Sequence, residues 1–97
     1  MILNSIAEWR NGYCVGEKDK DLDVPKKLQG DVKTGKYARD ECAVLCSEDR
    51  RTTACEYDIV KKTCTVHTES VTSYFTPPGV DNNKRCSIIL PKGMTHL

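Results

Sequence analysis

The sequence predicts a small α+β domain, in which one helix and several antiparallel strands are held together by disulfide bonds. Three observations support this class: six cysteines occur in only 97 residues, one segment has the apolar spacing of a helix, and later segments alternate as strands do. A chain of this length forms one domain and buries about 60–70% of its unfolded surface. Hydrophobic residues make up 38% and charged residues 30%, so the core is small and disulfides are its expected supplement.

The helix is expected at residues 37–49. Ala38, Cys42, Leu45 and Cys46 recur at helical spacing and form an apolar stripe. Because residues four apart lie one turn above each other, Cys42 and Cys46 point to the same side. Each of these two cysteines therefore needs a partner from another element.

Strands are expected at residues 13–15, 54–60, 63–68, 71–75 and 85–90. The second and third of these segments form a hairpin, in which Cys55 and Cys64 share an apolar face that a helix would cover. Glu56, Asp58 and His67 lie on the opposite, polar face. The polar stretch at 17–36, interrupted by proline and glycine, predicts a long loop or two short strands.

Six cysteines allow many pairings, and spacing alone does not choose among them. The expected elements narrow the choice, because the two helix cysteines should bridge to the two hairpin cysteines. We favour Cys42–Cys64 and Cys46–Cys55, because this nested order keeps the helix antiparallel to the strand that follows it. Cys14 and Cys86 then join the two terminal strands.

Cysteine usage also indicates a compartment. An even count without a C-x-x-C pair fits an oxidising, secreted or extracellular setting, whereas structural zinc is disfavoured because its usual close ligand pairs are missing. The chain start has neither the basic nor the apolar region of a signal peptide. We therefore expect a mature region, or a domain excised from a larger secreted or cell-surface protein.

The overall charge excludes some classes of partner. A formal net charge of +1 creates no general field that would attract nucleic acid or a membrane surface. No stretch approaches the roughly 20 apolar residues of a transmembrane helix. We expect neither nucleic-acid binding nor membrane insertion, and the sequence does not predict the oligomeric state.

Several short runs resemble the core of the PAN/apple domain family: GYC at the first cysteine, then ECAVLC, ACEYD and TCTVHT. The resemblance extends over residues 13–89 and rests on the spacing C-x3-C-x8-C-x8-C with one outer cysteine on each side. It implies a single helix on a curved antiparallel sheet of about five strands, with the same three disulfides. The organisation expected is an extension or edge segment at 1–12, a PAN/apple-like domain at 13–90 and a flexible tail at 91–97.

No catalytic constellation is visible in the sequence. If every cysteine is paired, no thiol nucleophile remains, and Ser70 and Ser73 lie near His67 without a G-x-S-x-G motif or a third triad member. The alternating aspartates that begin at Asp19 lack the glycine and glutamate of a calcium loop. We therefore expect no enzyme, no metal site and no cofactor.

The function expected is extracellular recognition or cell adhesion, with a protein or a carbohydrate as the ligand. A sugar site needs an exposed aromatic ring beside planar polar groups, and Tyr74 with His67 and Glu69 would supply them. A toxin-like or inhibitory effector on a disulfide scaffold is the alternative from another class.

Two basic doublets suggest a second kind of ligand. Arg50 and Arg51 follow the expected helix, and Lys61 and Lys62 lie at the expected hairpin tip. If these two ends converge, they form a patch for sulfated glycans such as heparin, and growth factors related to PAN/apple domains suggest that activity. Solubilising surface charge is the simpler interpretation of these doublets.

Overall fold

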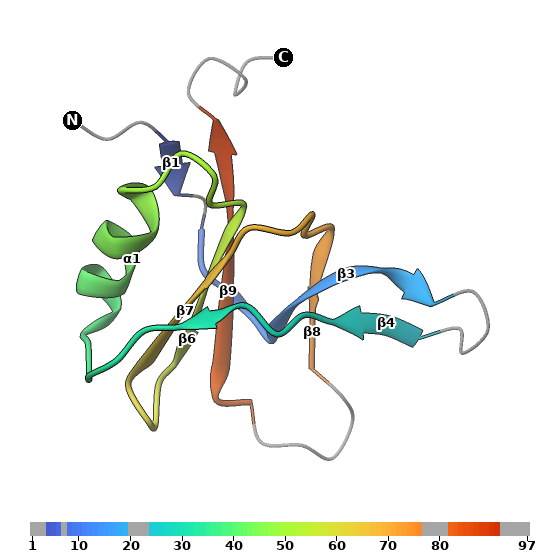
Figure 1. The fold of residues 1–97 in the computed structure, drawn as a ribbon. Helices are drawn as coiled ribbons and strands as arrows, with labels where there is room; N and C mark the ends of the chain where they lie inside the picture. Colours follow the sequence, from blue (N-terminus) through green and yellow to red (C-terminus); the bar gives the residue numbers. More distant parts are fainter. Residues whose placement is uncertain (1–3, 7, 20–23, 77–81, 92–97) are drawn as a thin grey trace.

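The computed structural model describes residues 4–6, 8–19, 24–76 and 82–91. Within these ranges the chain forms one helix and nine strands (Figure 1). In chain order they are β1 (Asn4–Ile6), β2 (Arg10–Asn11), β3 (Tyr13–Asp19), β4 (Val24–Lys27), β5 (Asp31–Val32), α1 (Arg39–Ser47), β6 (Ala54–Asp58), β7 (Thr63–His67), β8 (Ser73–Phe75) and β9 (Lys84–Pro91).

The main sheet is antiparallel and carries the helix. Its strand order is β1-β9-β6-β7-β5, and β2 also pairs with β9. Helix α1 lies along one face of this sheet, against β6 and β7 (Figure 1). One helix on an antiparallel sheet with three disulfides confirms the predicted fold class.

The helix is shorter than the predicted segment by two residues at each end. Its first turn is stabilised by Glu41, whose carboxylate accepts the backbone N–H of Ala38 at 2.8 Å. Asp40 and Glu41 also place negative charge at the positive end of the helix dipole. The buried side of α1 carries Cys42 and Cys46, so the apolar stripe faces the sheet as the spacing predicted.

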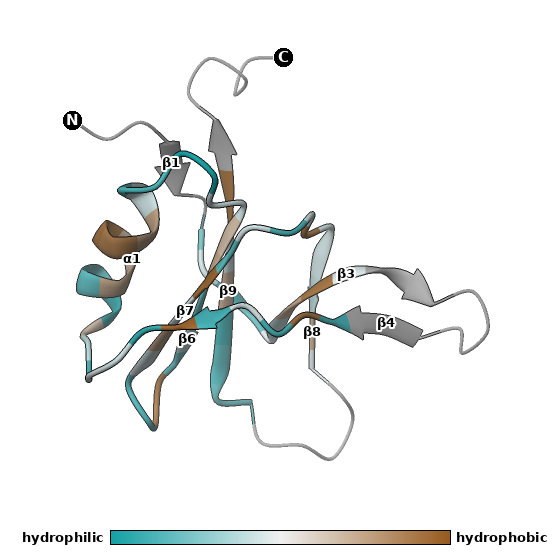
Figure 2. Ribbon diagram, in the orientation of Figure 1, coloured by the Kyte–Doolittle hydropathy of each residue, from teal (hydrophilic) through white to brown (hydrophobic). Residues whose placement is uncertain are grey.

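The helix-side core combines disulfides with aromatic side chains. Its buried members are Cys42, Cys46, Cys55, Tyr57, Cys64, Val66 and Ile89. Trp9 packs against this cluster with its ring edge-on to Tyr57, at a centroid distance of 6.4 Å. Figure 2 shows that β9 is hydrophilic at its start and hydrophobic further along, before the part drawn in grey.

All six cysteines are bonded, in the predicted pairing. The bridges are Cys14–Cys86, Cys42–Cys64 and Cys46–Cys55, with Cα–Cα distances of 5.2, 5.4 and 5.8 Å. Two of them join α1 to the β6–β7 hairpin. The third joins β3 to β9, and so ties a second layer of the fold to the main sheet.

That second layer is a three-stranded sheet in the order β4-β3-β8, which the sequence did not predict. It meets the main sheet where β3 contacts β6 and β9, on the face away from the helix. Cys14, Ala54 and Cys86 form a second buried cluster at this contact. Covered by the helix on one face and by this layer on the other, every residue of β6 is buried, and the expectation of a polar outer face on the hairpin is wrong.

Outside the helix and the hairpin, some predicted strands and segments agree with the structure and others do not. Strand β3 extends the predicted strand at 13–15 to residue 19, and the rest of the stretch at 17–36 includes the short strands β4 and β5, one of the two predicted alternatives. The predicted strand at 71–75 is reduced to β8. In the predicted N-terminal segment, β1 and β2 pair with β9. Residues 92–97 of the predicted tail, and 20–23 of the aspartate run, lie outside the described residues.

Gly12 provides a test of how β2 and β3 are joined. Its φ is +122°, and a Cβ there would lie 2.6 Å from the Phe75 carbonyl oxygen. We expect Gly12→Ala to lower the free energy of unfolding by about 2 kcal/mol or more, because backbone strain and a backbone clash combine. Urea denaturation measures this effect.

Gly35→Ala is the matched control for this change. Gly35 also has a positive φ, +110°, but its added Cβ would meet only ordinary contacts with Tyr37. A loss for Gly12→Ala no larger than that for Gly35→Ala would show that the contact with Phe75 carries no energetic weight.

Candidate functional site

A pocket opens on the sheet face opposite α1, with a volume of about 330 Å³. This is at the small end of the range for small-ligand sites. Its walls come from the stretch between the end of β4 and the end of β5, from the middle of the β6–β7 hairpin and from the start of β9. The lining residues are Lys27, Leu28, Gln29, Val32, Glu56, Thr65 and Lys84.

Glu56 is the buried acid of this pocket, with 6% of its surface exposed. Its Oε1 accepts the backbone N–H of Cys14 at 2.8 Å and lies 3.2 Å from His67 Nε2. Among the described residues, Oε2 has only the Lys84 ammonium near it, at 3.9 Å. That separation is too long for a hydrogen bond, so this oxygen retains capacity to accept one from a ligand.

His67 lies beneath the pocket and is 1% exposed. Because its Nε2 faces a carboxylate, that nitrogen is the donor in the contact with Glu56. Its Nδ1 is buried and has no hydrogen-bond partner within the described ranges. Gly30 allows the backbone to pass close to the ring, since a Cβ there would lie 2.7 Å from His67 Cε1.

Asp58 and Lys84 extend the charged network to one end of the central strands, where β6 ends and β9 begins. Asp58 Oδ1 accepts the backbone N–H groups of Val60 and Lys61 at 2.9 and 2.8 Å. The Lys84 ammonium lies 3.4 Å from Asp58 Oδ2 and therefore stands between two buried carboxylates. Burial acts to raise the pKa of Asp58, but the two backbone donors and Lys84 outweigh burial and lower that pKa overall.

The lowered pKa of Asp58 makes stability depend on acid. In the unfolded chain this carboxyl has its ordinary pKa near 3.8, so its contribution to folding is fully present at neutral pH. The contribution is lost as pH falls below that value toward the folded pKa. We expect urea midpoints at pH 6 and pH 3 to differ less in Asp58→Asn than in the unmodified protein.

The control for this comparison is Asp31→Asn, which alters an exposed carboxylate paired with Lys33. An equal response of the two variants to pH would contradict the role given to Asp58.

The structure separates the residues of the predicted sugar site. Tyr74 is 41% exposed and Glu69 is also exposed, but His67 is buried and bonded to Glu56. His67 therefore presents no surface to a ligand beside Tyr74, and its predicted role as a ligand contact is wrong. The hydrophobic alternation placed it on the polar face of the hairpin, and a second sheet covers that face.

The two basic doublets do not converge. Arg50 and Arg51 follow the end of α1, whereas Lys61 and Lys62 lie at the hairpin tip, where the Lys62 carbonyl accepts the N–H of Tyr37 beside the helix start. Strand β6 thus lies between the doublets. The predicted single anionic-ligand patch is not formed.

Arg51 is also engaged locally, because its guanidinium bonds the Asp49 carboxylate at 3.0 Å. This hydrogen bond holds the pKa of Asp49 below its usual value. This local ion pair accounts for the Arg51 guanidinium without any anionic ligand.

Sequence reasoning missed the pocket residues. The alternation of the hairpin marks Glu56 as a polar strand residue and nothing more, and no motif distinguishes Lys84. Nothing in the local pattern brings Gln29 or Val32 to Thr65, because strand β5 reaches β7 across more than thirty residues of chain. The one available signal was an acidic residue directly after Cys55 in a short strand.

No protein-family model, no curated protein and no solved structure matches this chain. Membership of the PAN/apple family therefore remains a prediction based on cysteine spacing. Among the residues that the structure describes, no helix is both long and apolar enough to cross a membrane. The three disulfides fit a secreted or extracellular protein.

Proposed function

We propose that the chain is an extracellular recognition module of PAN/apple-like fold, and that it binds a carbohydrate in the Glu56 pocket. The observation that supports this is the mixture of groups around the pocket. A buried carboxylate accepts hydrogen bonds, the ammonium groups of Lys27 and Lys84 donate them, and Gln29 does both. Sugar hydroxyls need this combination, because each one donates and accepts.

The apolar part of the lining suits the same ligand. Leu28 and Val32 stand beside the polar groups, and Val32 is largely exposed. A sugar ring has C–H faces that pack against such side chains while its hydroxyls meet the polar wall. Lys27 is held in place by the face of Tyr13, with its ammonium 5.1 Å from the ring centre.

The pocket is supported by rigid elements. Glu56 and Thr65 face each other across the β6–β7 ladder, and both bridges from α1 attach to the same hairpin. A site held in this way loses little conformational freedom when a ligand binds. We infer that the site binds its ligand and does not catalyse a reaction. His67 contacts Glu56 beneath the pocket and does not line it, so its ring is not placed to exchange a proton with a bound ligand.

A glycan array tests this proposal with the disulfide-bonded protein and two pocket variants. Thr65→Val keeps the side-chain shape and removes the hydroxyl, and Gln29→Ala shortens an exposed pocket residue. We expect the unmodified protein to select a defined set of glycans, and each variant to bind them about tenfold or more weakly.

Tyr74→Ala is the matched control, because Tyr74 is exposed and does not line the pocket. Binding that is lost in Tyr74→Ala but unchanged in the pocket variants would place the sugar elsewhere. Failure of the unmodified protein to bind any glycan would contradict the carbohydrate proposal and favour a protein ligand.

A further inference from the structure

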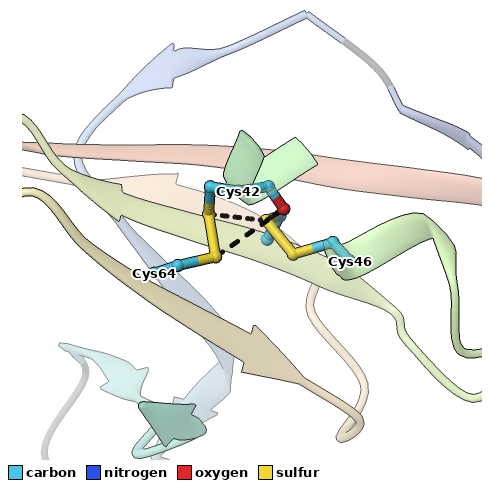
Figure 3. Close-up of side chains that lie close together, drawn as sticks. Cys42, Cys46 and Cys64 are labelled. Carbon is cyan, nitrogen blue, oxygen red and sulfur yellow. Dashed lines mark hydrogen bonds between the residues drawn. A yellow bond between two sulfur atoms is a disulfide. The ribbon is translucent and has the colours of Figure 1, made fainter. Parts of the chain in front are cut away.

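On the face of the main sheet that α1 covers, the disulfides Cys42–Cys64 and Cys46–Cys55 lie against each other. The Sγ atoms of Cys42 and Cys55, which belong to different bridges, are 3.3 Å apart. The four Sγ atoms of the helix and hairpin cysteines all lie within 4.8 Å of one another, and all four residues are fully buried. Figure 3 shows the sulfurs of Cys42, Cys46 and Cys64 converging between the helix and the hairpin.

Three separate elements fix this arrangement. Cys42 and Cys46 are one turn apart on α1, Cys55 lies on β6, and Cys64 lies on β7. The hairpin positions are diagonal neighbours, because Cys64 pairs with Tyr57 and not with Cys55. The sulfurs therefore approach from four directions, two from above the sheet and two from within it.

We propose that reduction converts this pair of disulfides into a tetrahedral site for one zinc ion, held by Cys42, Cys46, Cys55 and Cys64. Zinc–thiolate bonds are about 2.3 Å long, which places the sulfurs of a tetrahedral site about 3.8 Å apart. The Sγ atoms of Cys42 and Cys55 are 3.3 Å apart and all four sulfurs lie within 4.8 Å of one another, so one ion can reach all four once the two bonded pairs are opened. The proposal requires the Cys42–Cys64 and Cys46–Cys55 sulfurs to move apart to this spacing by side-chain rotation, with Cα–Cα distances of 5.4 and 5.8 Å as the starting point.

The chemistry balances with a phosphine as the named reductant. Each disulfide takes two electrons from one phosphine, which becomes a phosphine oxide using the oxygen of one water, and the two water protons complete two thiols. The four thiols then release four protons as they bind one Zn²⁺. The metal keeps its oxidation state throughout.

The surroundings favour a structural ion over a catalytic one. The four cysteines lie in a cluster with Tyr57, Val66 and Ile89, all buried. Four protein ligands leave no open coordination position, as in structural zinc sites. The ion would take over the role of both bridges, because it ties the same helix to the same hairpin, and its binding free energy becomes folding free energy.

The test uses the full chain, reduced with a phosphine under anaerobic conditions and titrated with Co²⁺ and then Zn²⁺. We expect one Co²⁺ per chain with the visible absorption of a tetrahedral thiolate complex, and its displacement by one Zn²⁺. Amide hydrogen exchange should show α1 protected with zinc and unprotected with a chelator. Protection distinguishes a built site from chelation by an unfolded chain.

Two variants locate the site. Cys64→Ser removes one ligand and should weaken Zn²⁺ binding by at least about 100-fold, beyond what changes around the ligands produce. The double change Cys14→Ala with Cys86→Ala should bind as the unmodified protein does, because reduction already opens that bridge. Equal weakening in both variants, a stoichiometry other than one, or bound metal without protection of α1 would each overturn the proposal.

Discussion

Reduction of all three disulfides in the presence of a metal chelator is expected to unfold the chain at neutral pH and room temperature. The bridges close segments of 72, 22 and 9 residues. Each contributes about 2–4 kcal/mol by limiting the unfolded state, and domains of this kind have a net stability of about 5–15 kcal/mol. Because much of the buried core consists of cysteine, apolar packing alone leaves little to offset that loss.

The amide NMR spectrum measures this outcome directly, with the oxidised protein in the same chelator as the control. Loss of chemical-shift dispersion is the expected result. A reduced, metal-free sample that kept its native spectrum would show that packing alone holds the two sheets and the helix together. The chelator matters, because the four-cysteine zinc site would otherwise restore part of the structure.

The helix and the hairpin could be predicted from sequence because their patterns are local. The i, i+4 spacing of Cys42 and Cys46 and the alternation around Cys55 and Cys64 determine which faces meet. Once those faces were assigned, geometry narrowed the disulfide pairing to a single favoured choice. The cysteines thus supplied the long-range information that local patterns lack.

The second sheet could not be predicted because its strands carry weak local signals. Strand β4 lies in a polar stretch, and β8 has only three residues. Its effect is to bury a face of the hairpin that the alternation marks as polar. The alternation of the hairpin therefore predicts that Thr65, His67 and Glu56 are exposed, whereas all three are buried in the structure.

Burial of Glu56 is offset by its hydrogen bonds to His67 Nε2 and to the backbone N–H of Cys14. The N–H of Cys14 comes from β3 and reaches a carboxylate on β6, which is a contact over 42 residues of sequence. The candidate pocket depends on this contact, because its acid is held in place by a strand of the other sheet. A site built from two sheets in this way leaves no contiguous motif in the sequence.

Glu56→Ala is expected to be among the most destabilising single changes in the chain, lowering the free energy of unfolding by about 3 kcal/mol or more. The change leaves the buried N–H of Cys14 and Nε2 of His67 without their acceptor, and each unsatisfied group costs about 1–3 kcal/mol. It also removes one of the two carboxylates beside Lys84. Urea denaturation of the disulfide-bonded protein measures the loss.

Glu56→Gln separates the role in folding from the role in binding. The amide oxygen still accepts the N–H of Cys14, so this variant should retain most of the stability that Glu56→Ala loses. It removes the negative charge from the pocket, however, and should weaken glycan binding while the fold persists.

Glu69→Ala, which removes an exposed carboxylate, is the control for the stability loss in Glu56→Ala. A urea midpoint for Glu56→Ala equal to that of this control would mean that the contact between the two sheets does not depend on Glu56.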